Sequence, residues 1–433
     1  MKLRYFLLGL VVPAMIICCD KPVDEPVDDG TKPKPEVPTP TPTPTPEVEL
    51  APEIKSGDCV LAPNKYAEEF VKNVTYPDRD YSYSVVLDYH GGYNGKLAEG
   101  ESVNGDKSSE YTIRWEANEA EGKLQLELAE QETGWSMTKE ITAGSNYVDI
   151  NNLTPNVHYT YKVSSIDNGT VMTEGNFTTY GHIRQVFFKT RVRNGRDMGG
   201  WLTYDGKMVK YHKIYRTGRW ESSTMANSGK KAIIAEGIKA QLDLRNTSDV
   251  LDAPAIEGMD FCAPLIETGG DSMLKAEKGD KTRQCMQFII DCVKADKPVV
   301  YHCSLGRDRT GTLGMIILGL LDVVEGDISK EYEVTYFSPR GWSIASSETY
   351  KTFQNLRTTW AYKPAAEYIW AGKYPNATYE FNDDKESPDY TPFSVRIEKY
   401  LLDIGISQAD IDAFRELMLT EPYADLTPAT PAE

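Results

Sequence analysis

The sequence predicts a multidomain protein: an N-terminal all-β sandwich, then an α/β domain built on a central, mostly parallel sheet. Residues 51–180 alternate apolar and polar side chains at a period of two between glycine and asparagine turns, a pattern typical of strands with one buried face. In residues 182–425, strand-like runs alternate with helical patterns, as in parallel sheets covered by helices. The length of 433 residues also exceeds what one compact core usually holds.

Charge and composition exclude several classes of function. The net charge of −18 makes nucleic acid an unfavourable partner, because polyanions repel each other. The five histidines are scattered, and the seven cysteines show no CxxC spacing. We therefore expect no nucleic-acid partner, no metal and no cofactor.

The N-terminus has the pattern of an export signal. Lys2 and Arg4 precede a short apolar run, and the segment IICCD follows it. This segment resembles a bacterial lipoprotein signal, in which the cysteine after the cleavage point is acylated. The resemblance implies a signal peptide at 1–19, a lipid on Cys19 and a lipid-anchored place in the bacterial cell envelope, at the outer membrane or the periplasmic face. A plain secretory signal is the alternative.

The next segment, residues 20–50, is expected to be an acidic linker. It has almost no apolar content and carries a Thr-Pro repeat, so it cannot bury enough surface to fold. Repeated prolines favour an extended polyproline II conformation.

The β region is predicted from period-two runs at 83–89, 111–115, 123–129 and 159–166. The stretch NLTPNVHYTYKVSSID (152–167) resembles the end of a fibronectin type III domain, which makes Tyr159 its corner tyrosine. No chemistry is apparent in this region, so a spacer or a binding module is expected.

The α/β region contains a regular series of elements. We expect strands at 207–218, 238–245 and 297–303, and helices at 281–296, at 310–324 and twice within 394–419. Cys285 and Cys292 share one face of the first of these helices and are expected to be core residues.

The segment HCSLGRDRTG (302–311) joins a predicted strand to a predicted helix. Backbone amides in such a glycine-containing loop bind an oxyanion at the positive end of the helix. The residues expected to line this cradle are Ser304, Leu305, Gly306, Arg307, Asp308 and Arg309. Arg309 can hold two phosphate oxygens, and the same surroundings favour a thiolate at Cys303. A cysteine that attacks a bound phosphate monoester is therefore predicted.

This segment fits the His-Cys-x(5)-Arg-Thr-Gly signature of the protein tyrosine phosphatase superfamily. VRNGRDMGGW (192–201), YRTG (215–218) and DLR (243–245) resemble motifs of its bacterial, tyrosine-phosphatase-like branch. The resemblance covers most of 183–420 and implies a phosphatase that works through a cysteinyl-phosphate intermediate. The segment between Phe337 and Pro392 is longer than usual for the family and could shape the rim of the pocket.

The sequence contains no Trp-Pro-Asp, so the usual general acid of eukaryotic tyrosine phosphatases is missing. Two aspartates are candidates for protonating the leaving group. Asp308 lies in the phosphate loop, as in phosphoinositide phosphatases of the myotubularin type, and is slightly preferred. Asp243 ends a neighbouring strand. Their alternative roles are to brace the loop and to form a salt bridge with Arg245 or with an arginine of RNGRD.

The remaining candidates lie in or near the loop, and several of them have two possible roles. Arg307 either binds a second phosphate of the substrate or is a solvated surface residue. His302 is expected to brace the loop, and Thr310 to hydrogen-bond the thiolate. Asn194, Arg196 and Asp197 either contact substrate or support the phosphate loop from below.

The sequence thus predicts a cysteine-dependent phosphomonoester hydrolase. Its partners would be a phosphorylated protein, a phosphoinositide or an inositol phosphate, and a membrane through the lipid anchor. The alternative function is a surface-exposed binding lipoprotein with a weakly active or inactive phosphatase domain.

Overall fold

The computed structural model describes residues 59–61, 65–73, 110–116, 122–188, 192–220, 225–246, 250–267, 273, 279–337 and 362–423. The predicted signal peptide with Cys19, the linker at 20–50 and the strand at 83–89 lie outside the described residues. By its internal contacts the chain divides into two units, Met1–Pro52 and Glu53–Glu433. Every element described below belongs to the second unit.

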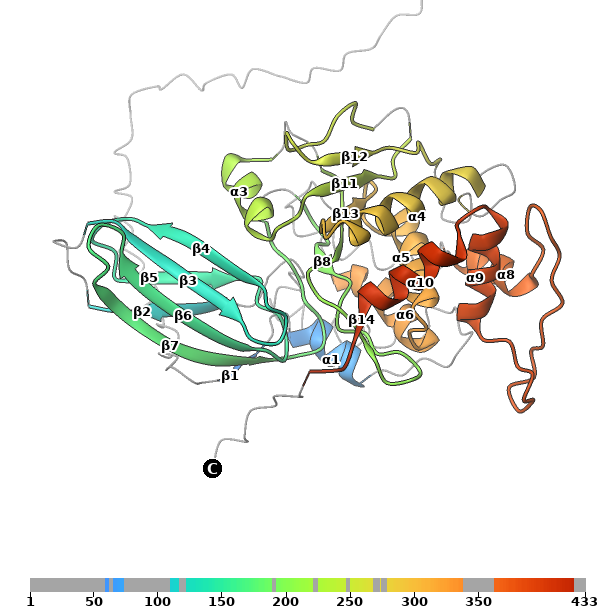
Figure 1. Ribbon diagram of the computed structural model, residues 1–433, viewed down its shortest axis with the longest axis horizontal. Coiled ribbons are helices and arrows are strands. Elements are labelled where there is room, and N and C mark those ends of the chain that lie inside the picture. Colours follow the sequence, from blue (N-terminus) through green and yellow to red (C-terminus); the bar gives the residue numbers. More distant parts are fainter. Residues whose placement is uncertain are drawn as a thin grey trace, which may run out of the picture. The chain divides into compact units, whose positions relative to one another are not determined.

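The N-terminal part of this unit contains two β-sheets (Figure 1). Their strands are β1 (Cys59–Leu61), β2 (Glu110–Arg114), β3 (Leu124–Glu130), β4 (Ser136–Ile141), β5 (Tyr147–Asn151), β6 (His158–Ser165) and β7 (Val171–Tyr180). The larger sheet has the order β1-β7-β6-β3-β4, and the smaller one pairs β2 with β5. Leu124, Leu126 and Leu128 alternate into a core that both sheets share. The strands predicted at 111–115, 123–129 and 159–166 are confirmed.

Tyr159 occupies the centre of this core. Its hydroxyl accepts a hydrogen bond from the Thr154 amide (2.8 Å) and donates one to Glu130 (2.5 Å). Its ring stacks on Phe177, which also stacks on Tyr111. A tyrosine that bonds back to the backbone a few residues upstream has the geometry expected of a corner tyrosine. Membership of the fibronectin type III family stays a prediction.

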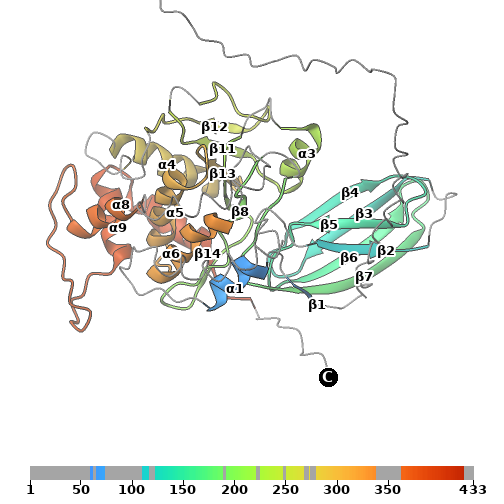
Figure 2. The same cartoon turned by 180° about the vertical axis from the view of Figure 1, so that it is seen from behind.

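The expectation that 51–180 is entirely β is wrong at one place. Helix α1 (Lys65–Asn73) presents Ala67, Phe70 and Val71 on one face, and these residues belong to the core of the α/β region. Lys330 donates to the carbonyl of Val71 (3.1 Å). Figure 2 shows α1 beside the α/β elements, on the side where α6 lies. Ala67, Phe70 and Val71 have the i, i+3, i+4 spacing of a helix, but a pattern of three residues is too short to predict a helix from the sequence.

The α/β region is built on a five-stranded sheet. Its strands are β8 (Arg196–Asp197), β10 (Ile214–Thr217), β11 (Ala240–Asp243), β12 (Asp260–Cys262) and β13 (Val299–His302), in the order β12-β11-β13-β10-β8. All neighbours are parallel except β8 with β10. The strand predicted at 207–218 is interrupted: β9 (Met208–Val209) pairs instead with β14 (Leu419–Thr420). The break includes His212, whose φ of 62° is not a strand conformation.

Helices cover both faces of the sheet. They are α3 (Asn227–Ala235), α4 (Gly279–Lys294), α5 (Asp308–Leu320), α6 (Glu325–Glu333), the 3-10 turn η4 (Val334–Phe337), α8 (Lys363–Ala371), α9 (Phe393–Asp403) and α10 (Gln408–Met418). The predicted helix at 281–296, the helix at 310–324 and the two helices within 394–419 are confirmed as α4, α5, α9 and α10. Cys285 and Cys292 are buried, as predicted.

Side chains alternate along β13, so they enter two different cores, one on each face of the sheet. Val299 and Tyr301 point into the larger core, which α4, α5 and α9 complete. Val300 points into a smaller core with α3. Because α5 lies between the sheet and other helices, all of its residues except Asp308 are buried, which explains its almost uniformly apolar sequence.

The expectation that the segment between Phe337 and Pro392 shapes the pocket rim stays a prediction, because residues 338–361 lie outside the described residues. The described part of the segment contacts α9. The Arg396 guanidinium lies 4.0 Å from the Trp370 ring and 4.7 Å from the Phe381 ring. It also donates to the carbonyls of Thr391 and Asn382. In residues 362–392 these contacts stabilise a local structural cluster.

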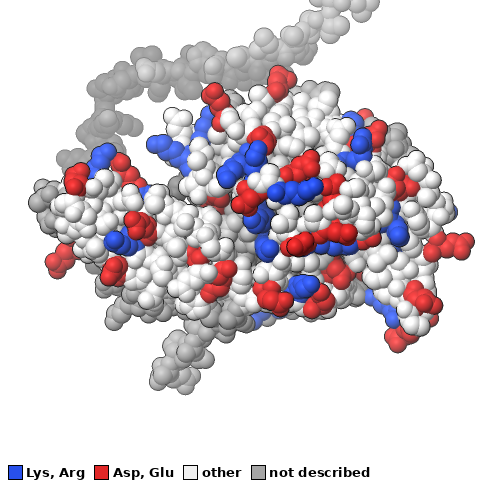
Figure 3. All heavy atoms as spheres, viewed as in Figure 1, with Lys and Arg blue, Asp and Glu red and all other residues white. Residues whose placement is uncertain are grey.

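Charges on the surface are mixed. On the face shown in Figure 3, acidic and basic side chains of the described residues are interspersed. Within the described part of the chain, no helix has the length and apolar character needed to cross a bilayer.

A buried polar cluster connects the sandwich to the α/β region. Glu130 of β3 bonds His212 (2.8 Å), and Asn152 donates to Glu236 (2.9 Å), which also pairs with Arg184 (2.8 Å). Unpaired, such buried groups would be costly, so these contacts constrain both regions. The predicted border at 180/182 is therefore not a break in packing.

Glu130→Gln should destabilise the protein at neutral pH. Burial raises the pKa of Glu130, but the charge and hydrogen bond of His212, with Arg184, outweigh it and lower the pKa from 4.5 to about 2. Because the folded-state value lies below the unfolded one, the stabilisation is complete above about pH 4.5 and lost as pH falls toward 2. We expect the free energy of unfolding at pH 7, measured by urea denaturation, to fall by about 3 kcal/mol. The difference from wild type should shrink below pH 4.5. Glu140→Gln, at an exposed pair with Lys123, is the control and should stay within about 0.5 kcal/mol of wild type. An equal loss at every pH would contradict the assignment.

Candidate active site

The segment 303–307 forms a loop between β13 and α5, at the carboxyl end of the central strand of the sheet. His302, the last residue of β13, is aligned with Thr217 of β10 on one side and Asp243 of β11 on the other. In open parallel sheets, ligands bind at the carboxyl ends of the strands. The usual place is where the connections that follow two neighbouring strands run to opposite sides of the sheet. The helix begins at Asp308, so Asp308 and Arg309 belong to its first turn.

Gly306 makes the tight turn of the loop possible. Its φ of 69° lies in the left-handed region, and a Cβ there would come within 2.5 Å of the Thr217 carbonyl oxygen. The loop can therefore approach the end of β10 only if this residue is glycine.

Three consecutive carbonyls of the loop are held from outside. The carbonyl of Ser304 accepts from the Arg219 amide (3.2 Å), and that of Leu305 from Asn194 Nδ2 (3.3 Å). The carbonyl of Gly306 accepts from Asn194 Nδ2 (2.9 Å) and Arg216 Nη2 (2.7 Å).

These carbonyl contacts set the direction of the amides that follow. In a planar trans peptide, the N–H points opposite to the preceding C=O. The N–H groups of Leu305, Gly306 and Arg307 therefore point away from their anchors, into the concave side of the loop. Together with the amides of the first turn of α5, which make no intrahelical hydrogen bond, they form a cradle suited to an oxyanion.

A buried ionic platform supports the loop. Arg216 pairs with Glu331 of α6, and Arg196 donates to Glu331 (2.8 Å) and to Asn194 Oδ1. Asn194 and Arg196 thus support the loop from below, which is one of the two roles proposed for them. Arg216 lies in the YRTG motif, but its contact with the loop was not foreseen. Glu331 was also missed, because the helix EGDISKEYE contains no recognisable motif.

Cys303 lies at the base of the cradle, with 3% of its surface exposed. Burial raises the pKa of its thiol, but Arg309 and the hydroxyl and amide of Thr310 outweigh burial, so the pKa is lowered from its ordinary value. The Thr310 hydroxyl has no nitrogen or oxygen partner among the described residues, which leaves it available to the sulfur. These surroundings favour the thiolate form of Cys303 more than an ordinary cysteine environment does.

Arg309 is held in position by main-chain oxygens. Its Nη1 donates to the carbonyls of Leu244 (3.1 Å) and Ile266 (3.0 Å), which follow β11 and β12. Its Nη2 lies 3.5 Å from the Ser304 hydroxyl, against the loop. A guanidinium fixed along one side can present its other donors to a bound phosphate.

Asp308 lies at the rim of the cradle and forms two hydrogen bonds with Arg307 (2.7 and 2.9 Å). The side chains are 29% and 16% exposed, respectively. Tyr332 of α6 donates to Asp308 at 3.5 Å. Arg307 is thus paired with its neighbour, and its predicted role in binding a second phosphate stays a prediction.

Asp243 has a different environment, with no exposed surface. Its carboxylate accepts from Arg245 Nη2 (2.7 Å) and Nε (2.9 Å) and from the Arg245 amide (3.0 Å). Burial raises the pKa of Asp243, but a positive charge on His302, where it is present, and the hydrogen bonds and charge of Arg245 lower the pKa below its ordinary value. With His302 neutral, Arg245 supplies this effect. This is the salt bridge considered as the alternative for Asp243, and it keeps the carboxylate ionised.

His302 braces the loop as a neutral ring. The Ala255 amide donates to Gln241 Oε1 (2.7 Å), so Gln241 Nε2 must donate to His302 Nε2 (2.9 Å). The ring proton is therefore on Nδ1, 3.3 Å from the Cys303 carbonyl. Burial lowers the pKa of His302 to about 4, although Asp243 opposes it. Sequence reasoning did not identify Gln241.

Asp197, predicted either to contact substrate or to support the phosphate loop, makes hydrogen bonds elsewhere. Its carboxylate accepts from Arg184 (3.1 Å) and from the amides of His212 (2.8 Å) and Gly199 (2.9 Å). These partners belong to the junction with the sandwich. Although Arg196 and Asp197 are adjacent in RNGRD, alternation along β8 directs them to opposite sides.

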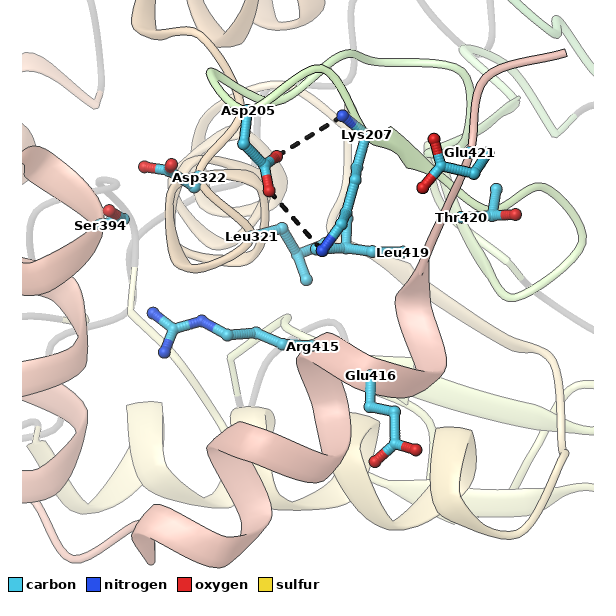
Figure 4. A pocket seen from close by; sticks show the side chains of 10 residues that line it. All are labelled: Asp205, Lys207, Leu321, Asp322, Ser394, Arg415, Glu416, Leu419, Thr420 and Glu421. Atoms are coloured by element: carbon cyan, nitrogen blue, oxygen red, sulfur yellow. Dashed lines mark hydrogen bonds and ion pairs between the residues drawn. The ribbon is translucent and has the colours of Figure 1, made fainter.

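A cavity of about 500 Å³ lies near the ends of α5 and α10 (Figure 4). Its lining includes Asp205, Lys207, Asp322 and Arg415, and no residue of the phosphate loop. Lys207 pairs with Asp205, and Arg415 with Glu398. The cavity is therefore separate from the cradle.

A cysteine with a lowered pKa at the base of a loop of inward-facing amides has the arrangement expected of a cysteine-dependent phosphatase. A model of the tyrosine phosphatase family matches residues 189–420, more than half of the 433 residues. A protein of Cupriavidus necator provisionally named a tyrosine-protein phosphatase is 24% identical over 164 residues, 33% of this chain and 59% of that protein. The chain belongs to the tyrosine phosphatase family.

Of Cys262, Cys285, Cys292 and Cys303, the last should be alkylated by iodoacetamide at the lowest pH. The pKa of its thiol is lowered, whereas burial raises those of Cys262, Cys285 and Cys292. Peptide mapping by mass spectrometry after a pH series measures the modification at each position. Thr310→Val should shift the Cys303 midpoint upward and leave the other three unchanged. A Cys303 midpoint equal to that of Cys262 would contradict the assignment.

Proposed function

We propose that the protein is a metal-independent phosphomonoester hydrolase that works through a cysteinyl-phosphate intermediate. The observation that supports this most directly is the position of Cys303. It lies at the base of a loop whose carbonyls accept hydrogen bonds from outside, beside Arg309, whose guanidinium is held by two main-chain oxygens. Membership of the tyrosine phosphatase family supports the same chemistry.

In the first step, the Cys303 thiolate attacks phosphorus and forms an S–P bond as the P–O bond to the leaving group breaks. The amides of the loop and Arg309 stabilise the negative charge on the three phosphoryl oxygens. Asp308 donates its proton to the departing oxygen.

In the second step, a water attacks phosphorus and the S–P bond breaks. Asp308, now ionised, accepts the proton of this water. The sulfur leaves as a thiolate, stabilised by the Thr310 hydroxyl and by Arg309. Inorganic phosphate is released, and the enzyme returns to its starting state.

Asp308 is preferred over Asp243 as the acid because it is accessible. Asp308 is partly exposed, whereas Asp243 is buried and held by Arg245. Asp308 must open its pair with Arg307 and take up a proton before it donates one. Partly exposed ion pairs of this kind are worth about 0–1 kcal/mol, so opening costs little.

The proposed substrates are phosphoproteins, phosphoinositides or inositol phosphates, and the proposed location is the bacterial cell envelope, with a lipid anchor on Cys19. The signal-like N-terminus supports export. Phosphate release from a panel of phosphopeptides, phosphoinositides and inositol phosphates would identify the substrate class.

Hydrolysis of p-nitrophenyl phosphate tests the activity itself. We expect turnover in the presence of EDTA, inhibition by vanadate and complete loss in Cys303→Ser. Turnover that survives in Cys303→Ser would exclude the mechanism. A wild-type protein with no turnover of any substrate in the panel would favour the alternative, a binding lipoprotein with an inactive phosphatase domain.

Asp308→Asn should affect poor leaving groups more than good ones. An alkyl phosphate needs a proton on its leaving oxygen, whereas p-nitrophenolate leaves readily without one. We expect kcat/KM, which reports the first step, to fall by about 10²–10⁴ for the alkyl phosphate and much less for p-nitrophenyl phosphate. The second step is the same for both substrates and does not enter this comparison. Asp243→Asn is the control: any loss there should be equal for both substrates. If Asp243→Asn showed the leaving-group dependence instead, the two roles would be reversed.

A further inference from the structure

Glu331 of α6 is buried, with 2% of its surface exposed, and lies behind the phosphate loop. One carboxylate oxygen accepts from Arg196 Nε (2.8 Å), and the other accepts from Arg216 Nη1. The backbone carbonyl of Glu331 also accepts from Arg196 Nη2 (2.9 Å). One residue thus fixes the orientation of two guanidinium groups.

Both arginines contribute to holding the carbonyl oxygen of Gly306, one directly and one through Asn194. Arg216 donates directly to the Gly306 oxygen (2.7 Å). Arg196 donates to Asn194 Oδ1, so the Nδ2 group of Asn194 must face the loop, where it lies 2.9 Å from the same oxygen. Two hydrogen-bonded routes therefore join Glu331 to Gly306.

The positive charges of Arg196 and Arg216 can lie this close together because the Glu331 carboxylate compensates them. Arg196 and Arg216 are 3% and 0% exposed. Burial and the charge of Arg216 lower the pKa of Arg196 to about 10, against the opposing effect of Glu331. Without Glu331, two buried like charges would repel each other and lose their shared acceptor.

We propose that Glu331 is a positioning residue that determines the direction of the Arg307 amide in the oxyanion cradle. The Gly306 carbonyl and the Arg307 N–H belong to one peptide plane, so fixing the carbonyl from behind directs the N–H toward the phosphate. This inference deepens the proposed function and rests on it. It assigns a role in catalysis to a helix that contributes no residue to the signature segment.

Glu331→Gln tests the proposal with orthovanadate as the probe. The amide keeps the shape of the side chain but loses its charge, and its nitrogen cannot accept from an arginine. We expect orthovanadate affinity and kcat/KM for p-nitrophenyl phosphate to fall by about 10- to 100-fold, the effect of losing one charge-assisted hydrogen bond. The alkylation midpoint of Cys303 should rise, which a loss of stability alone would not produce.

Glu236→Gln is the matched control. Glu236 is a similarly buried carboxylate (6% exposed) that pairs with Arg184 at 2.8 Å, at the sandwich junction. It should lose comparable stability while its orthovanadate affinity and Cys303 midpoint stay at the wild-type values. Equal effects of both substitutions on orthovanadate binding would overturn the proposal.

Arg216→Lys keeps the test decisive if Glu331→Gln does not fold. A single ammonium cannot reach both Glu331 and the Gly306 carbonyl as the guanidinium does, so orthovanadate affinity should again fall. Unchanged affinity in either folded variant would overturn the proposal. Failure of the proposed function is distinguishable: wild-type protein would then bind orthovanadate but turn over no substrate.

Discussion

The carbonyl of Gly306 has to face away from the place where phosphate binds, and much of the surrounding structure serves this requirement. A short loop does not choose this orientation by itself, because its peptides could rotate to other conformations. Glycine permits the turn, and donors on Asn194 and Arg216 then hold the oxygen. These donors come from segments more than eighty residues away in sequence, so the cradle forms only when the sheet does.

Electrostatics divides the site into a rear and a front. Behind the loop, Arg196 and Arg216 share the carboxylate of Glu331, and their charges are largely compensated. In front, Arg309 is held by neutral carbonyls, so its charge acts on the thiolate and on bound phosphate. A chain with a net charge of −18 can thus bind an anion, because the local field of the loop outweighs the distant surface charges.

The sandwich and the α/β region interact through more than a linker. Glu130 and Asn152 reach His212 and Glu236 in buried contacts, and α1 adds apolar residues to the α/β core. The same region contains Asp197, whose neighbour Arg196 belongs to the support of the phosphate loop. Two adjacent residues of RNGRD therefore serve two different parts of the molecule. These buried contacts hold the β region against the α/β region.

The sequence by itself determined the local parts of this protein. Period-two runs predicted β2, β3 and β6, apolar spacing predicted α4, α5, α9 and α10, and the segment 302–311 identified Cys303, Arg309 and the cradle, because each depends on neighbouring residues. Only the tertiary structure decided which distant side chains meet this segment. It placed Arg216 and Glu331 behind Gly306 and directed Asp197 toward Arg184 and the sandwich. These outcomes depend on strand order and on which side of a strand a residue faces. No local pattern encodes them, because the partners lie far apart along the chain.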